Sequence, residues 1–184
     1  MVKQVNGWFD MPGRPGDRTF DQQLMGLDWL WANCAGKTVL DAGCAEGLIA
    51  LRCADYGAVA VGGVELVEDR VRVARKLALS YWNVDFEVGD MNTWAPPKQY
   101  DIVLGLAILH KLKDPGRVAA RLANAARETV IFRLPPLGAP TINDRRSGNI
   151  PHDIGSVMGG CGFELTEATN DGPFGEWIGR WSRK

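Results

Sequence analysis

Cysteine and histidine are scarce in this 184-residue sequence, and long apolar runs are missing from it. The four cysteines (Cys34, Cys44, Cys53 and Cys161) form no CxxC pair, and there are only two histidines, so no zinc-site pattern is present. No apolar run reaches the about 18 residues of a membrane span, and MVKQVNGWFD lacks the apolar segment of a signal peptide. We therefore expect a cytoplasmic protein without a metal site or membrane association.

An excess of either charge is also lacking. Lysine and arginine total 21, aspartate and glutamate 22, and the net charge is −1. Because nucleic-acid-binding proteins usually carry a basic face, a nucleic-acid partner is possible but not favoured. The hydrophobic fraction of 46% is normal for a globular protein, and the length suits one domain.

What the sequence does contain is an alternation of apolar strand and helix patterns. The first 17 residues are rich in turn formers, so we expect no regular structure there, and a helix should begin at Thr19, where Thr19 and Gln22 form a capping box. Strands are then predicted at 38–41, 59–65, 84–88, 100–108 and 129–134, and helices at 48–56, 68–81 and 116–126. A loop at 137–151, a short helix at 153–160 and an antiparallel hairpin of strands 163–169 and 176–182 complete the prediction.

Strand-helix alternation of this kind predicts a parallel sheet with helices on both faces. The expected fold is an α/β three-layer sandwich with a seven-stranded, mostly parallel sheet and an antiparallel C-terminal strand. We expect a single domain over 1–184, with an N-terminal lid and helix (1–35), a cofactor-binding core (36–135), and a substrate loop followed by the hairpin (136–184).

The turn after the first predicted core strand, in TVLDAGCAEGLIAL, marks the candidate site. In doubly wound sheets ligands bind beyond the carboxyl ends of the strands. Gly43 and Gly47 permit a sharp turn into a helix, but no third glycine follows at the spacing that a dinucleotide pyrophosphate requires. The carboxylate of Asp41 would repel a pyrophosphate and attract an amine, so the turn does not favour a dinucleotide.

The segment VLDAGCAEG resembles the first motif of class I S-adenosylmethionine-dependent methyltransferases, written D/E-x-G-x-G-x-G, with Ala45 in the place of the middle glycine. The resemblance implies a Rossmann-like fold, S-adenosyl-L-methionine as cofactor and S-adenosyl-L-homocysteine as product. Further segments are similar to the family over nearly the whole chain, including GGVEL, EVGDM, GLAILHKLKDP and GGCGFELTEA.

By this resemblance Glu65 would bind the ribose hydroxyls, and Asp90 and Met91 the adenine; backbone groups near Gly105 and Leu106 would touch the methionine part. From the residues alone, Glu65 could instead be a helix-start carboxylate and Asp90 a turn residue. The cofactor-binding residues implied by the resemblance are Asp41, Gly43, Cys44, Ala45, Gly47, Glu65, Leu66, Asp90, Met91, Gly105 and Leu106.

His110 follows the fourth core strand and is the candidate general base, with His152 a weaker second. A capping or loop-packing role for His110 is an equal alternative. The segment from Trp8 to Arg18 is a candidate lid, in which Arg18 could pair with the cofactor carboxylate, with an anionic substrate or in a surface salt bridge. The loop 137–151 is a second candidate specificity element.

The acceptor is expected to be a small molecule, because LAILHKL resembles the corresponding segment of small-molecule methyltransferases and the N/D-P-P-Y motif of nucleic-acid amino methylases is absent. O-, N- and C-methylation stay open. The alternatives are a tRNA- or RNA-modifying methyltransferase, because the N-terminal helix followed by GKTVLDAGC faintly resembles enzymes of the tRNA wobble uridine, and a non-catalytic S-adenosylmethionine-binding subunit.

Overall fold

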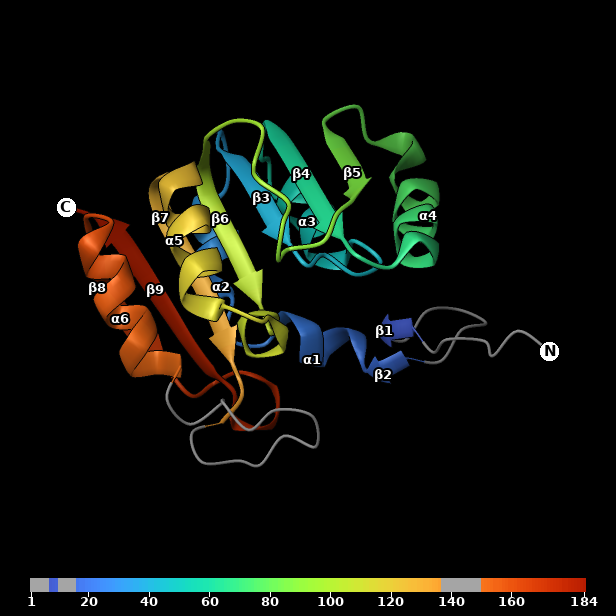
Figure 1. Ribbon diagram of the computed structural model, residues 1–184. Helices are drawn as coiled ribbons and strands as arrows, with labels where there is room; N and C mark the ends of the chain where they lie inside the picture. The colour runs from blue at the N-terminus through green and yellow to red at the C-terminus, as the bar shows by residue number, and fades with distance from the viewer. Residues whose placement is uncertain (1–6, 10–15, 137–149) are drawn as a thin grey trace.

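The computed structural model describes residues 7–9, 16–136 and 150–184 (Figure 1). Its main feature is a seven-stranded sheet in the order β5-β4-β3-β6-β7-β9-β8. The strands of this sheet are β3 (Thr38–Ala42), β4 (Ala60–Glu65), β5 (Val84–Val88), β6 (Tyr100–Leu106), β7 (Ala126–Leu134), β8 (Phe163–Thr169) and β9 (Trp177–Arg183). Neighbours from β5 to β7 pair in parallel, and β9 pairs antiparallel with both β7 and β8. The predicted three-layer architecture and the C-terminal hairpin are confirmed.

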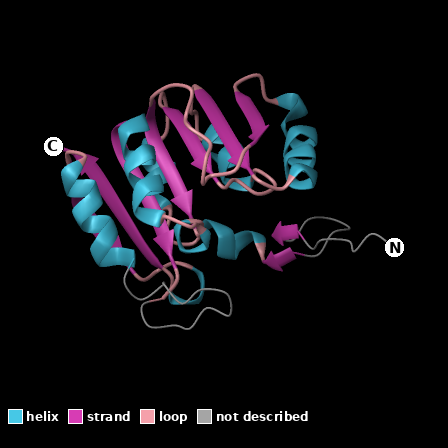
Figure 2. Ribbon diagram, viewed as in Figure 1, coloured by secondary structure: helices cyan, strands magenta, loops and turns pink. Residues whose placement is uncertain are grey.

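Helices cover both faces of the sheet (Figure 2). One face carries α2 (Asp28–Asn33), α3 (Leu48–Asp55) and α4 (Glu68–Leu77), and the other carries α5 (Pro115–Ala125) and α6 (Ile150–Gly160). Each face has its own buried apolar cluster. No helix in the described part of the chain is both long and apolar enough to cross a bilayer.

Local signals account for most element ends. Asp114 caps α5 by accepting the N–H of Arg117 at 2.9 Å, and Pro115 occupies the first turn, where a missing N–H costs nothing. The helix predicted at 68–81 is shorter, because α4 ends at Leu77 and continues as the 3-10 turn η1 (Ala78–Ser80). The strand predicted at 100–108 ends at Leu106, before the 3-10 turn η2 (Leu109–Lys111).

The N-terminal region departs most from prediction. The capping box of Thr19 and Gln22 is present, but the helix stops after α1 (Phe20–Leu24), because the chain turns at Gly26 with φ +71° before α2 begins. The turn-rich start contains two short parallel strands, β1 (Gly7–Phe9) and β2 (Gly16–Arg18), where no regular structure was expected. The proposed lid lies partly in 10–15, and most of the specificity loop in 137–149, both outside the described residues.

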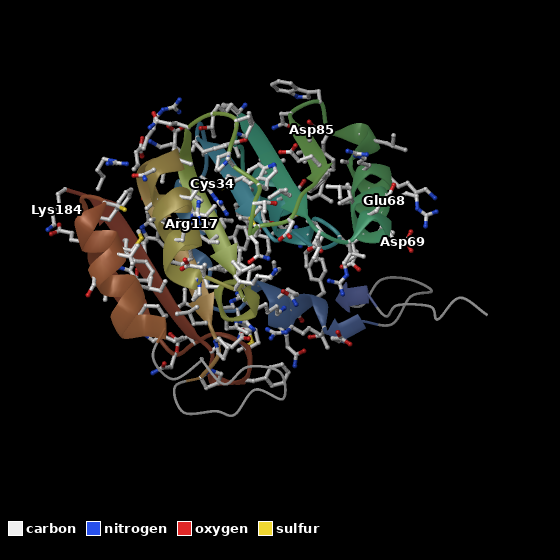
Figure 3. The ribbon with its side chains drawn as sticks, viewed as in Figure 1. Cys34, Glu68, Asp69, Asp85, Arg117 and Lys184 are labelled. Carbon is white, nitrogen blue, oxygen red and sulfur yellow. The ribbon has the colours of Figure 1, made fainter. Side chains whose placement is uncertain are left out.

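The topology concentrates the candidate residues at one end of the sheet. From β3 the chain moves outward to β4 and β5, then returns to the other side of β3 through β6, so strand order reverses between β3 and β6. The carboxyl ends of these strands face α1 (Figure 1). In Figure 3, Asp69 in the first turn of α4 lies towards this end, whereas Asp85 of β5 lies towards the amino ends of the strands.

Candidate cofactor site at the carboxyl ends of the strands

The turn between β3 and α3 has a left-handed backbone at three alternate residues. Gly43, Ala45 and Gly47 have φ values of +82°, +49° and +84°. The N–H groups of Gly43 and Cys44 donate to the carbonyl of Val64 at 2.8 and 3.0 Å, which ties the turn to the end of β4. Ala45 therefore adopts a conformation that normally favours glycine, and such strain is typical of functional turns.

Glu65, the last residue of β4, is 8% exposed and braces this turn. Its Oε2 accepts the N–H of Ala45 at 3.1 Å, and its Oε1 accepts the N–H of Val67 at 2.9 Å. The carboxylate thus connects the glycine turn to the segment that leads into α4. Each oxygen retains a lone pair for a further donor, such as a hydroxyl group.

Asp41 is 2% exposed, and its Oδ2 has no hydrogen-bond partner within the described residues. Burial raises the pKa of Asp41 to about 7, and the nearby charge of Glu65 acts in the same direction. The backbone N–H of Ala50 and the charge of Arg133 oppose this rise. A buried carboxylate with an unsatisfied oxygen is costly, so the position fits a group that supplies a cationic donor.

A cavity of about 270 Å³ lies beside the turn. The residues that line it are Gly43, Ala45, Glu65, Leu66, Val67, Arg70, Gly89, Asp90, Met91, Asn92, Leu106, Ala107, Ile108, Lys111 and Leu112. Asp90 Oδ1 accepts both the backbone N–H and the side-chain amide of Asn92 at 2.8 Å. These hydrogen bonds hold the pKa of Asp90 below its usual value. They use only the Oδ1 atom of the carboxylate and not its Oδ2 atom.

A second, smaller cavity of about 20 Å³ adjoins the first. The two share Gly43, Ala45 and Leu106, and the smaller one is also lined by Gln23, Asp41, Cys44, Leu48 and Ile49. Of the predicted cofactor-binding residues, all except Gly47 and Gly105 line one of these cavities. Both exceptions are close-packed positions, because a Cβ would lie 2.5 Å from Phe86 at Gly47 and 2.7 Å from Phe132 at Gly105.

Comparison with known proteins places this arrangement in a family. A methyltransferase-domain family model matches residues 39–129, which include the turn, Glu65 and Asp90. The ubiquinone biosynthesis O-methyltransferase of Thiobacillus denitrificans is 36% identical over 99 residues, covering 52% of this chain and 42% of the relative. The chain spans between 35% and 52% of the length of such curated relatives.

Solved structures agree on the fold. The magnesium protoporphyrin IX methyltransferase of Synechocystis PCC 6803 with bound S-adenosylmethionine superimposes with a TM-score of 0.72 and 26% identity, over 90% of this chain and 80% of that one. Its complex with S-adenosylhomocysteine gives a TM-score of 0.74 at 23% identity, covering 90% and 84% of the two chains. The chain belongs to the class I methyltransferase family.

Two cationic side chains that were not predicted as site residues from the sequence, Arg70 and Lys111, line the larger cavity. Arg70 lines the cavity and lies 3.7 Å from the buried carboxylate of Glu46, inside the glycine turn. Lys111 also lines it, and desolvation, followed by the charges of Arg70 and Arg18, lowers the pKa of Lys111. The Glu46–Arg70 pair had a signal in the sequence. Glu46 is an acidic residue inside the methyltransferase motif, and the predicted helix at 68–81 is rich in basic residues.

His110 lies in η2, next to the cavity but outside both lining sets. Its neighbours Ile108 and Lys111 do line the larger cavity. A catalytic role for His110 therefore stays a prediction, because it requires the His110 side chain to reach a bound acceptor. His152 falls within α6, and its side chain is outside the described set.

A buried ion-pair cluster fixes α1 to the core of the protein. Arg133 of β7 is 1% exposed, and its Nη2 donates to the carbonyls of Gln23 and Met25 at 3.0 and 2.8 Å. Its Nε lies 3.9 Å from Glu176, which Arg18 binds in a bidentate pair at 2.9 and 2.6 Å. Desolvation lowers the pKa of Arg133 to about 10. The lone basic residue in the apolar run VIFRLP was the signal that could have identified it.

Proposed function

We propose that this chain is an S-adenosylmethionine-dependent methyltransferase acting on a small-molecule acceptor, with S-adenosylhomocysteine as product. The observation that carries the proposal is the set of three acids at the ends of β3, β4 and β5, namely Asp41, Glu65 and Asp90, grouped around a glycine turn in a class I methyltransferase fold. The match of the family model over this segment supports it.

Each acid suits a different part of such a cofactor. Glu65 would accept the ribose hydroxyls with the lone pairs that remain beside its two backbone hydrogen bonds. Asp90 Oδ2 would accept from the adenine amino group, with the buried Met91 against the ring. Asp41 would face the cationic amine of the methionine end.

The chemistry is an in-line displacement in which the acceptor's lone pair takes the methyl group and the sulfonium becomes a neutral thioether. Protein groups contribute mainly by orienting the acceptor and excluding water. If the acceptor must lose a proton, a nearby base takes it, and His110 is our proposed base. Arg70 and Lys111 line the same cavity as Glu65 and Asp90, so they place cationic groups beside the proposed adenosine site.

The proposed acceptor class is supported by the named relative, whose own activity is ubiquinone biosynthesis O-methylation. Methylation of RNA or a role as a non-catalytic subunit would instead leave small-molecule screens negative. Methyl uptake by tRNA alone would favour the former, and activity only with a partner protein the latter.

The decisive experiment is calorimetric titration with S-adenosylmethionine and S-adenosylhomocysteine, with NAD as control, followed by screens of metabolite pools and tRNA for methyl uptake. We expect both adenosyl ligands to bind and NAD not to bind. Binding of NAD without S-adenosylmethionine would overturn the proposal.

His110 is tested once an acceptor is known. We expect His110→Ala to lower turnover strongly, by about 100-fold if it is a general base, while cofactor affinity changes little. Turnover is measured against pH in parallel with cofactor titration. Unchanged turnover would remove His110 from the mechanism.

A further inference from the structure

The connection between β5 and β6, residues 89–99, contains no helix or strand, unlike the other connections between successive parallel strands of the sheet (Figure 1). It nevertheless carries Asp90 and Met91, which line the larger cavity. A connection without a helix has to be ordered by contacts with other elements, because a free loop would lose conformational entropy when it binds a ligand. The contacts that order this loop therefore decide how well Asp90 is placed.

Asn92 supplies two of these contacts through the two ends of its side-chain amide. Its Nδ2 donates to Asp90 Oδ1 at 2.8 Å, and its Oδ1 accepts the backbone N–H of Lys113 at 3.0 Å. An ionised carboxylate can only accept and a backbone N–H can only donate, so the amide fits in one orientation, and neither an aspartate nor an apolar residue could make both contacts. Asn92 therefore connects the end of β5 with the segment between η2 and α5.

Arg121, in α5, is the second anchor of the loop. Its Nη2 donates to the backbone carbonyl of Met91. Lys113 and Arg121 both follow η2 in the chain, so the loop is fastened to α5 and to the turn before it. The backbone N–H and the side-chain amide of Asn92 both use Asp90 Oδ1, and neither uses Oδ2. The carboxylate is thus held in one orientation, with one oxygen available to a ligand.

We infer that Asn92 and Arg121 are positioning residues that fix Asp90 for selective recognition of the amino group of an adenine base. The inference rests on the proposed function, in which Asp90 Oδ2 accepts from that group. A carboxylate held in place favours an amino group, which donates, over the carbonyl of a 6-oxopurine, which only accepts. A carboxylate free to rotate could turn from that carbonyl to the neighbouring ring N–H of the 6-oxopurine, so its selectivity would be lower.

The test compares two ligands that differ only in this part of the base. Wild-type protein, Asn92→Ala and the neighbouring control Thr93→Ala are titrated calorimetrically with S-adenosylhomocysteine and with S-inosylhomocysteine, whose base is a 6-oxopurine. We expect wild type to prefer the adenosyl ligand at least about 10-fold, the contribution of one hydrogen bond to a charged group. Asn92→Ala should lower this preference at least about 5-fold, because Asp90 loses a side-chain donor. The Thr93 hydroxyl contacts the backbone carbonyl of Asp90 and not its carboxylate, so Thr93→Ala should leave the preference unchanged.

An unchanged preference in Asn92→Ala would overturn the inference even if both ligands bind more weakly, because a merely structural role weakens both equally. Equal binding of the two ligands by wild type would also overturn it, while leaving the proposed function intact. If wild type binds neither ligand, the proposed function itself fails, and the inference with it. Should Asn92→Ala not fold, Arg121→Met, which releases the Met91 carbonyl, is titrated with the same two ligands. A lower preference then supports the inference, and an unchanged one overturns it.

Discussion

The two cavities of the site differ in the contacts that hold their polar residues in place. In the larger one, Glu65 and Asp90 are anchored by backbone and side-chain donors of the protein itself, so the acids are in place before any ligand arrives. In the smaller one, Asp41 and Gln23 each have an atom with no hydrogen-bond partner among the described residues. The backbone of Gln23 is held by Arg133, which in turn pairs with Glu176. The acids of the larger cavity are therefore held by hydrogen bonds within the core that follows β3, whereas the smaller cavity also depends on contacts between that core and the N-terminal helix α1.

Removal of Arg133 should have the largest effect, because it detaches the N-terminal side of the smaller cavity. We expect Arg133→Met to lower the free energy of unfolding by about 3–5 kcal/mol, since Glu176 and two backbone carbonyls lose a buried charged partner. Urea unfolding measures this. The matched control Arg127→Met breaks a half-exposed pair with Asp101 and should cost under about 1 kcal/mol; equal losses would contradict the comparison.

Asp41 should make stability depend on pH. Its pKa rises from 3.8 to about 7 on folding, so between these values the folded chain holds a proton that the unfolded chain releases. The free energy of unfolding of the ligand-free protein should therefore fall as pH rises from about 4 to 7, by up to about 4 kcal/mol. Urea unfolding across this pH range should show a smaller fall in the free energy of unfolding for Asp41→Asn than for the wild type. If the free energies of the two proteins change with pH in parallel, Asp41 is not the group that causes the fall.

Glu65 tests the preorganised cavity. We expect Glu65→Ala to lower the free energy of unfolding by about 1–3 kcal/mol, because the N–H groups of Ala45 and Val67 lose a charged acceptor, and to weaken S-adenosylhomocysteine by a similar amount. Calorimetry and urea unfolding measure the two effects. The control is Glu167→Ala, which removes an exposed ion pair with Arg180. If Glu65→Ala changes stability as little as this control does, the turn does not depend on its hydrogen bonds to Glu65.

The smallest effect is expected at Ala45. Its φ of +49° is strained for alanine, so Ala45→Gly should stabilise the protein by about 1 kcal/mol or less, the relief of strain being partly offset by chain entropy. Thermal unfolding measures this. Ala54→Gly, within α3, should act in the opposite direction, and loss of stability in both variants would mean that the turn is unstrained.

Much of the core was readable from the sequence because its signals are local. The five parallel strands are short apolar runs between turn residues, and Asp41, Glu65 and Asp90 each come at or just after the end of one. The N-terminal region was predicted less well for the same reason. Its apolar spacing resembles one helix, but Gly26 divides it, and Phe20 remains 37% exposed.

The sequence by itself determined the layered fold and the glycine turn with its acids, since periodicity and turn chemistry act over a few residues. Only the tertiary structure decided which polar groups share a cavity. Gln23 is an ordinary helix residue until Arg133, 110 positions away, fixes its backbone beside Asp41. Burial is a property of the packed chain, and burial is what turns these polar side chains into a candidate binding site.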